Sequence, residues 1–189
     1  CRREESNYCP TFGSLGHNIN GGFAEFVRVK KEKVFHIPDY LSFNAAALSE
    51  PVACCIHAVD RANIRYGDTV VIFGAGSMAQ ILGQLFKASN AEKVYMIAGK
   101  SSKLELAAKY GIIPIEMDRN DYSVHEKALL KENPLGVDLI IDATGSTKVI
   151  SESMKLLKKG GTLLQYAIVH SGEKVEMDPV LMFNNELTY

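Results

Sequence analysis

The sequence lacks several features that mark common classes of protein. Its 189 residues carry a formal net charge of only -1, so there is neither a basic surplus for nucleic acid nor an acidic tail. It has no apolar run of roughly eighteen or more residues, the length that a membrane span needs. Its first ten residues, CRREESNYCP, do not resemble a signal peptide. These absences favour a cytoplasmic protein with a small-molecule partner, and they argue against nucleic acids and membranes.

Cysteine is also scarce, with four residues in the chain. Cys54 and Cys55 are adjacent in the apolar stretch VACCIHAV, which predicts buried thiols that pack as small hydrophobic groups. Cys1 and Cys9 bracket a polar, charged segment, a pattern that in an intracellular protein indicates metal binding more than a disulfide. Because the chain begins on cysteine rather than methionine, we expect it to be part of a longer protein.

The pattern of apolar residues changes near Pro51. Before it, residues 20–39 (NGGFAEFVRVKKEKVFHIPD) contain an Asn-Gly turn and then an alternation that predicts half-exposed antiparallel strands. After it, a helix is predicted at residues 50–63, and apolar runs then alternate with helical stretches. The nearly continuous apolar runs are typical of parallel strands covered on both faces, so we expect a doubly wound α/β fold. The expected strands lie at 69–73, 93–98, 112–117, 137–144 and 162–169, with the start of a sixth at 186–189, and the helices at 78–89, 102–111, 122–132 and 147–161.

A glycine-rich turn follows the first of these strands. In VVIFGAGSMAQILGQL, the residues Gly74, Gly76 and Ala79 have the GxGxxA spacing between a strand and a helix. Gly74 permits a tight turn, Gly76 lets the backbone approach a pyrophosphate, and Ala79 lets the helix pack closely on the strand. The alternative is an ordinary strand-to-helix turn that uses glycine only for its geometry. We predict a dinucleotide site here, with contacts from Gly74, Ala75, Gly76, Ser77 and Met78.

The acidic residue that should follow the second strand is missing. In an NAD site a carboxylate there binds the ribose hydroxyls and repels a 2′-phosphate. This chain instead offers small residues, two lysines and two serines, which favours NADP(H) over NAD(H). The alternative is a solvated loop in which Ser101 or Ser102 caps the next helix and the lysines face water. The candidate residues of this loop are Ala98, Gly99, Lys100, Ser101, Ser102 and Lys103.

Together, four segments resemble the zinc-dependent medium-chain dehydrogenase/reductase family, specifically its sorbitol-dehydrogenase-like polyol branch. The resemblance implies that residues 1–52 are the C-terminal part of a GroES-like catalytic domain. Residues 53–189 would then be a Rossmann dinucleotide-binding domain that is truncated at its sixth strand. The four segments are GGFAEF (21–26), IPDYLSFNAAALSEP (37–51), GAGSMA (74–79) and DATGS (142–146).

The resemblance also implies metal ligands. Cys1 and Cys9 match the third and fourth cysteines of a structural zinc lobe, whose first two are expected upstream. Glu50 matches an acidic residue that approaches the catalytic zinc directly or through water, so it is the candidate catalytic residue. The alternative for Glu50 is an acid at the start of a helix, before Pro51.

The implied activity is hydride transfer between a secondary alcohol or ketose and NADP(H) or NAD(H). The substrate would be an alcohol, polyol or ketone, and the full-length protein would form a homo-oligomer. Ala143, Thr144 and Gly145 would line the cofactor cleft, with Ala167 and Ile168 near the nicotinamide. This chain alone would bind the cofactor without turnover. Two alternatives remain: a zinc-free oxidoreductase of the quinone-reductase type, and a non-catalytic dinucleotide-sensing module.

Overall fold

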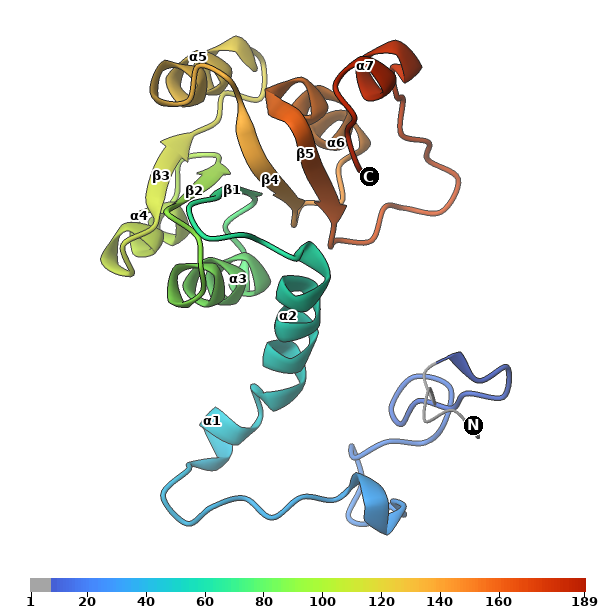
Figure 1. Cartoon of the computed structure of the whole chain (residues 1–189). Coiled ribbons are helices and arrows are strands. Elements are labelled where there is room, and N and C mark those ends of the chain that lie inside the picture. Colours follow the sequence, from blue (N-terminus) through green and yellow to red (C-terminus); the bar gives the residue numbers. More distant parts are fainter. Residues whose placement is uncertain (1–7) are drawn as a thin grey trace. The chain divides into compact units, whose positions relative to one another are not determined.

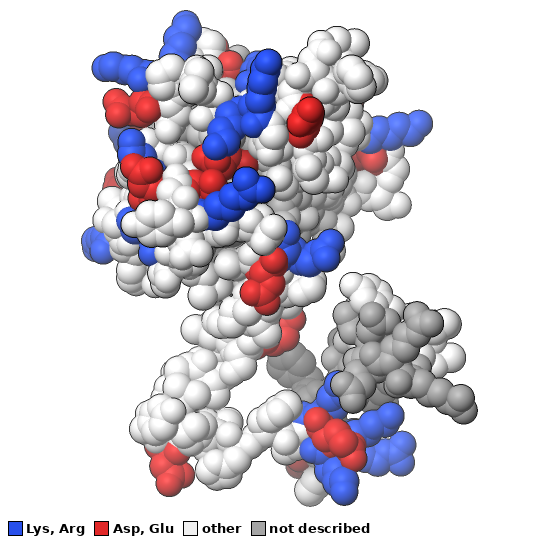
Figure 2. All heavy atoms as spheres, in the orientation of Figure 1, with Lys and Arg blue, Asp and Glu red and all other residues white. Residues whose placement is uncertain are grey.

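The computed structural model describes residues 8–189, which divide after Ala46 into two compact units (Figure 1). In the first unit the regular elements are a 3-10 helix at Lys31–Lys33 and helix α1 at Phe43–Ala46. The second unit, Ala47–Tyr189, contains the whole β-sheet. On the face that Figure 2 shows, acidic and basic side chains are interspersed over the second unit, as the small net charge leads one to expect.

The antiparallel strands predicted at residues 20–39 are not formed, and that prediction was wrong. The described residues of the first unit contain one isolated bridge, between Leu15 and Ile19, and no strand. Alternating apolar residues form a stable strand only when one face is buried against a partner. Here Phe23, Phe26 and Phe35 are exposed, and none of residues 8–46 is buried.

Five parallel strands form the sheet in the order β3-β2-β1-β4-β5, which confirms the doubly wound α/β prediction. The chain order reverses between β1 and β4, so the loops after these two strands diverge to opposite sides of a crevice. Every residue of Val70–Phe73 is buried, as expected for a central strand with both faces covered. The strands are β1 (Thr69–Phe73), β2 (Lys93–Ala98), β3 (Ile113–Glu116), β4 (Val137–Asp142) and β5 (Leu157–Gln165).

Alternate side chains of the strands build two separate hydrophobic clusters, one on each face of the sheet. Ile72 and Met96 point into the first cluster, with residues of α2 (Ser49–Ala62), α3 (Ser77–Ala88) and α4 (Ser102–Lys109). Phe73 and Ile97, their neighbours in sequence, point into the second. That cluster includes residues of α5 (Ser123–Glu132) and α6 (Thr147–Ser153), and residues of α7 (Pro179–Asn184) pack against it. No helix of the described residues is long and apolar enough to cross a membrane.

The end of the chain departs from the sequence prediction. The helix expected at 147–161 ends at Ser153, and β5 begins four residues later, at Leu157. Gly160 has a φ of 75° in a strand whose pairing with β4 shifts register, so its glycines serve an irregular strand rather than a helix end. The strand expected at 162–169 stops at Gln165, and the expected sixth strand is one parallel bridge between Thr162 and Thr188. Helix α7 was not predicted.

Candidate functional site

The turn between β1 and α3 has the geometry of an anion-binding loop. Gly74 has a φ of 110°, and a Cβ atom there would lie 3.1 Å from the carbonyl oxygen of Ala143, so only glycine fits without strain. At Gly76 a Cβ atom would meet no heavy atom within 4 Å, so this residue borders open space. Ala79 is buried against the sheet. The first N–H groups of α3, which have no partner within the helix, therefore face an accessible space.

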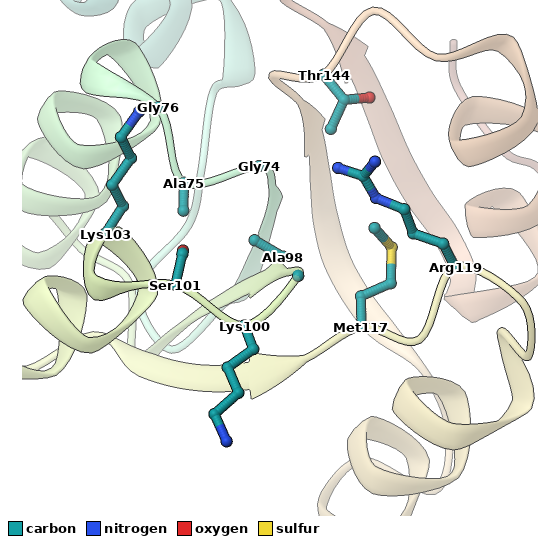
Figure 3. Close-up of a pocket in the computed structure, with 11 residues that line it drawn as sticks. Gly74, Ala75, Gly76, Ala98, Lys100, Ser101, Lys103, Met117, Arg119 and Thr144 are labelled. Atoms are coloured by element: carbon teal, nitrogen blue, oxygen red, sulfur yellow. The ribbon is translucent and has the colours of Figure 1, made fainter.

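A pocket of about 290 Å³ lies where the loops after β1, β2, β3 and β4 meet (Figure 3). Its wall contains three basic side chains and no carboxylate. A site of this charge favours an anionic ligand. The lining residues are Gly74, Ala75, Gly76, Ala98, Gly99, Lys100, Ser101, Lys103, Met117, Arg119 and Thr144.

The basic loop after β2 places its side chains in different directions. Ser101 is the N-cap of α4, because its hydroxyl oxygen accepts a hydrogen bond of 3.3 Å from the N–H of Leu104. This capping leaves the hydroxyl proton available, so the cap and a contact to a ligand are compatible. In Figure 3, Ser101 points toward Ala75 and Lys103 extends toward the Gly76 turn, whereas Lys100 points away from both.

Two buried polar side chains hold the loops of the pocket in place. Gln80 donates a hydrogen bond of 2.7 Å from Nε2 to the carbonyl oxygen of Lys103, which ties α3 to the start of α4. Asp142, at the end of β4, accepts hydrogen bonds from the N–H of Thr144 (3.0 Å), the hydroxyl of Thr144 (2.5 Å) and the N–H of Gly145 (3.1 Å). The turn after β4 is therefore fixed by a buried carboxylate.

Several residues predicted for the cofactor cleft do not line this pocket. Ser77 and Met78 are the first two residues of α3, directly after Gly76. Gly145 has a φ of 71°, and a Cβ atom there would lie 2.5 Å from the carbonyl oxygen of Ile168, so these two backbones are in contact. The N–H of Ala167 donates to the carbonyl oxygen of Asp142 at 3.0 Å. The carbonyl group of Ala143, the residue directly after β4, lies against Gly74.

The predicted metal ligands do not form a metal site within the described residues. Cys1 lies outside them. Cys9 contacts the hydroxyl of Thr11 at 3.3 Å, and hydrogen bonds with Thr11 lower the pKa of its thiol. Glu50 is exposed in the first turn of α2. In residues 8–189 no group of three His, Cys, Asp or Glu side chains could hold a metal ion, so these residues do not complete a zinc centre.

The adjacent cysteines of α2 have different environments, so the prediction that both are buried was half right. Cys55 is fully buried, its Sγ lies 3.5 Å from the hydroxyl of Tyr166, and burial raises the pKa of its thiol. Cys54 is exposed and donates a hydrogen bond of 3.2 Å from Sγ to Oε1 of Glu50, which raises the pKa of Cys54. Successive side chains of an α-helix point about 100° apart, and here Cys55 faces the core while Cys54 faces away from it.

Met117 and Arg119 line the pocket but were not identified from the sequence. Both follow β3, which pairs with β2 so that Glu116 lies opposite Ala98. The N–H of Met117 also donates to the carbonyl oxygen of Ala98 at 2.8 Å. A basic residue a few positions after the third strand was the available signal, since the carboxyl ends of neighbouring parallel strands lie at one edge.

Comparisons with known proteins agree with this geometry. A family model described as zinc-binding dehydrogenase matches residues 74–188. D-arabinitol dehydrogenase 1 of Uromyces fabae is 32% identical over 189 residues, which cover 99% of this chain and 54% of that protein. D-arabitol-phosphate dehydrogenase of Enterococcus avium is 29% identical over 192 residues, covering 100% of this chain and 54% of the relative.

A solved structure from Sinorhizobium meliloti 1021, described as a zinc-binding dehydrogenase bound to NADP, superimposes on the chain with a TM-score of 0.88 at 30% identity. The superposition covers 100% of this chain and 55% of that structure. The chain therefore spans about half the length of the relatives it matches.

Proposed function

The chain belongs to the zinc-binding dehydrogenase family, and from this premise we propose that its second unit binds NADP(H) in preference to NAD(H). The observation that carries the proposal is the pocket beside the glycine turn, whose wall has three basic side chains and no carboxylate. Gly74, Gly76 and the first turn of α3 would hold the pyrophosphate. Ser101 and Lys103 would hold the 2′-phosphate of the adenosine ribose by charge-assisted hydrogen bonds.

For the whole protein we propose a zinc-dependent alcohol or polyol dehydrogenase that transfers hydride between a secondary alcohol or ketose and the nicotinamide. The names of the two polyol-related relatives support this substrate class. Residues 1–52 would then be part of a GroES-like domain, and Glu50 would approach the catalytic zinc. A cytoplasmic location and a homo-oligomeric assembly belong to the same proposal.

The described residues have a more limited role in this proposal. Since residues 8–189 complete no metal site, we assign them the binding and orientation of the dinucleotide. Thr144, in the turn after β4 and held by the buried Asp142, lines the pocket and would keep the cofactor at the carboxyl edge of the sheet. Bound nicotinamide supplies the hydride acceptor or donor.

The proposal is tested by titrating the purified chain with NADP+ and NAD+ in separate calorimetric experiments at the same ionic strength. We expect NADP+ to bind about tenfold more tightly or better, because a charge-assisted hydrogen bond contributes roughly 1.5–3 kcal/mol. Tighter binding of NAD+ would contradict the cofactor preference. For the whole protein, metal analysis separates a zinc-dependent dehydrogenase from a zinc-free oxidoreductase, and the absence of any turnover with bound zinc would favour a sensing module.

A further inference from the structure

We propose that Arg119 is a specificity-determining residue that pairs with the 2′-phosphate of NADP(H). This inference rests on the proposed function and adds to it a contact from β3, across the pocket from Lys103. Arg119 lines the same pocket as Ser101 and Lys103. In a dinucleotide-binding fold the loop after the second strand supplies such contacts, and in this chain the loop after β3 contributes as well.

The topology of the sheet brings Arg119 to this position. β2 and β3 are parallel neighbours, and their pairing ends with Ala98 opposite Glu116. The hydrogen bond from the N–H of Met117 to the carbonyl oxygen of Ala98 continues this pairing one residue beyond β3. Residues 99–101, which lead into α4, and residues 117–119 therefore leave the sheet side by side, and Arg119 reaches the pocket from the second segment.

No carboxylate neutralises Arg119 on its own loop. The side chain of Asp118 accepts a hydrogen bond of 2.8 Å from the N–H of Asn120, so this acid is engaged in a local turn. Neither Asp118 nor Glu116 lines the pocket. Among residues 8–189, Arg119 forms no ion pair within 4.0 Å. In Figure 3 its guanidinium lies between Met117 and Thr144, directed across the pocket.

The charges that line the pocket favour the binding of an anion next to Arg119. Lys103 and Arg119 both line this cavity and carry like charges that repel each other, and a bound dianion reverses that repulsion. A guanidinium presents paired N–H donors that match two phosphate oxygens, whereas an ammonium acts as a point charge. The other use of an arginine beside a nucleotide is to stack on the adenine ring, and this use would not distinguish NADP(H) from NAD(H).

The experiment measures the affinities of NADP+, NAD+ and 2′,5′-ADP for the unaltered chain, for Arg119→Gln and for Arg119→Lys. The matched control is Arg65→Gln, which removes the same charge from an exposed residue that does not line the pocket. We expect Arg119→Gln to lose about ten- to a hundredfold in affinity for NADP+ and 2′,5′-ADP and to keep its affinity for NAD+. Arg119→Lys should lose less, because it keeps the charge but not the paired donors.

The possible outcomes separate this inference from the function on which it rests. Equal losses for NADP+ and NAD+ would show adenine stacking and overturn the inference. Arg119→Gln values indistinguishable from those of Arg65→Gln would also overturn it. If the unaltered chain binds neither dinucleotide, the proposed function itself fails. Far-ultraviolet circular dichroism of each variant checks that its fold is intact before the affinities are compared.

Discussion

Gly76 and Gly145 were both predicted for the candidate site, but glycine is needed at the two positions for different reasons. Gly145 has a φ of 71°, a backbone conformation that residues other than glycine rarely adopt. A Cβ atom at this position would also lie 2.5 Å from the carbonyl oxygen of Ile168. Gly76 has an ordinary extended backbone with φ of -67° and free space in front of it. Gly145 is therefore needed for folding, and Gly76 is needed only for a ligand that fills the space in front of it.

Alanine substitutions separate these two requirements. Gly145→Ala should lower the free energy of unfolding by at least roughly 1–2 kcal/mol, the cost of a left-handed backbone, before the contact with Ile168 is counted. Gly76→Ala should cost less than about 1 kcal/mol, since only the cap residue changes. Yet Gly76→Ala should lower the affinities for NADP+ and NAD+ alike, because the added methyl group would occupy the space of the pyrophosphate. Urea unfolding and calorimetric titration measure the two effects, and an unchanged affinity of Gly76→Ala would remove this residue from the site.

At the scale of elements, the site depends on how α3 and α4 are joined. Gln80 is buried on α3, and its Nε2 donates to the carbonyl oxygen of Lys103 at 2.7 Å. Its Oε1 is buried without a hydrogen-bond partner among the described residues, an arrangement that usually costs stability. A leucine or methionine would pack here without that cost, so the amide serves the position of α4 more than the stability of the core.

Substituting Gln80→Met tests this coupling, since methionine has nearly the same length without the polar groups. We expect the free energy of unfolding to change by less than about 1 kcal/mol, because the loss of the hydrogen bonds of Nε2, of which only the one to Lys103 is short, is offset by the removal of an unpartnered oxygen. Affinity for NADP+ should fall severalfold more than affinity for NAD+, because Lys103 is no longer held in place. Gln84→Met, an exposed position one turn later on the same helix, is the control. A parallel decrease for both dinucleotides would indicate a purely structural role.

At the scale of the whole molecule, stability comes from the second unit, since every buried hydrophobic residue of the described chain lies between Cys55 and Leu163. One buried residue of this unit is a histidine, a residue type whose ordinary pKa lies close to neutral pH. His125, on α5, lies edge-on to the rings of Phe73 and Tyr122, with centroid distances of 5.9 and 5.1 Å. Its burial lowers the pKa of the imidazole below the usual value of 6.5.

Proton binding by His125 should therefore oppose folding of the unit. As the pH falls below about 6.5, the unfolded chain takes up a proton that the folded chain does not, so the free energy of unfolding decreases until the pH reaches the folded pKa. His125→Phe should remove this part of the decrease, whereas His170→Asn, at an exposed position, should retain it. Urea unfolding at several pH values between about 7.5 and 5 measures the difference. If His125→Phe keeps the pH dependence of the unaltered chain, the decrease in stability does not come from protonation of His125.

Most of the fold of the second unit could be predicted from the sequence, because its strands are continuous apolar runs and its helices repeat at helical spacing. The strands predicted for the first unit were wrong. Alternation in residues 20–39 is a local signal, and a strand forms only where another strand or a core is available. The start of β5 was also missed, because Met154 and Leu157 satisfy a helical pattern as well as a buried strand.

For the site, the sequence by itself determined the glycine turn, the basic loop and the absence of a carboxylate after β2, because each depends on residues close together in the chain. Only the tertiary structure decided that Arg119 joins Lys103 in one pocket and that Lys100 points away. It also decided that Gln80 ties α3 to α4. These relations depend on which strands are neighbours and on which side chains the packing leaves free, and such long-range contacts leave no periodic signal in a single sequence.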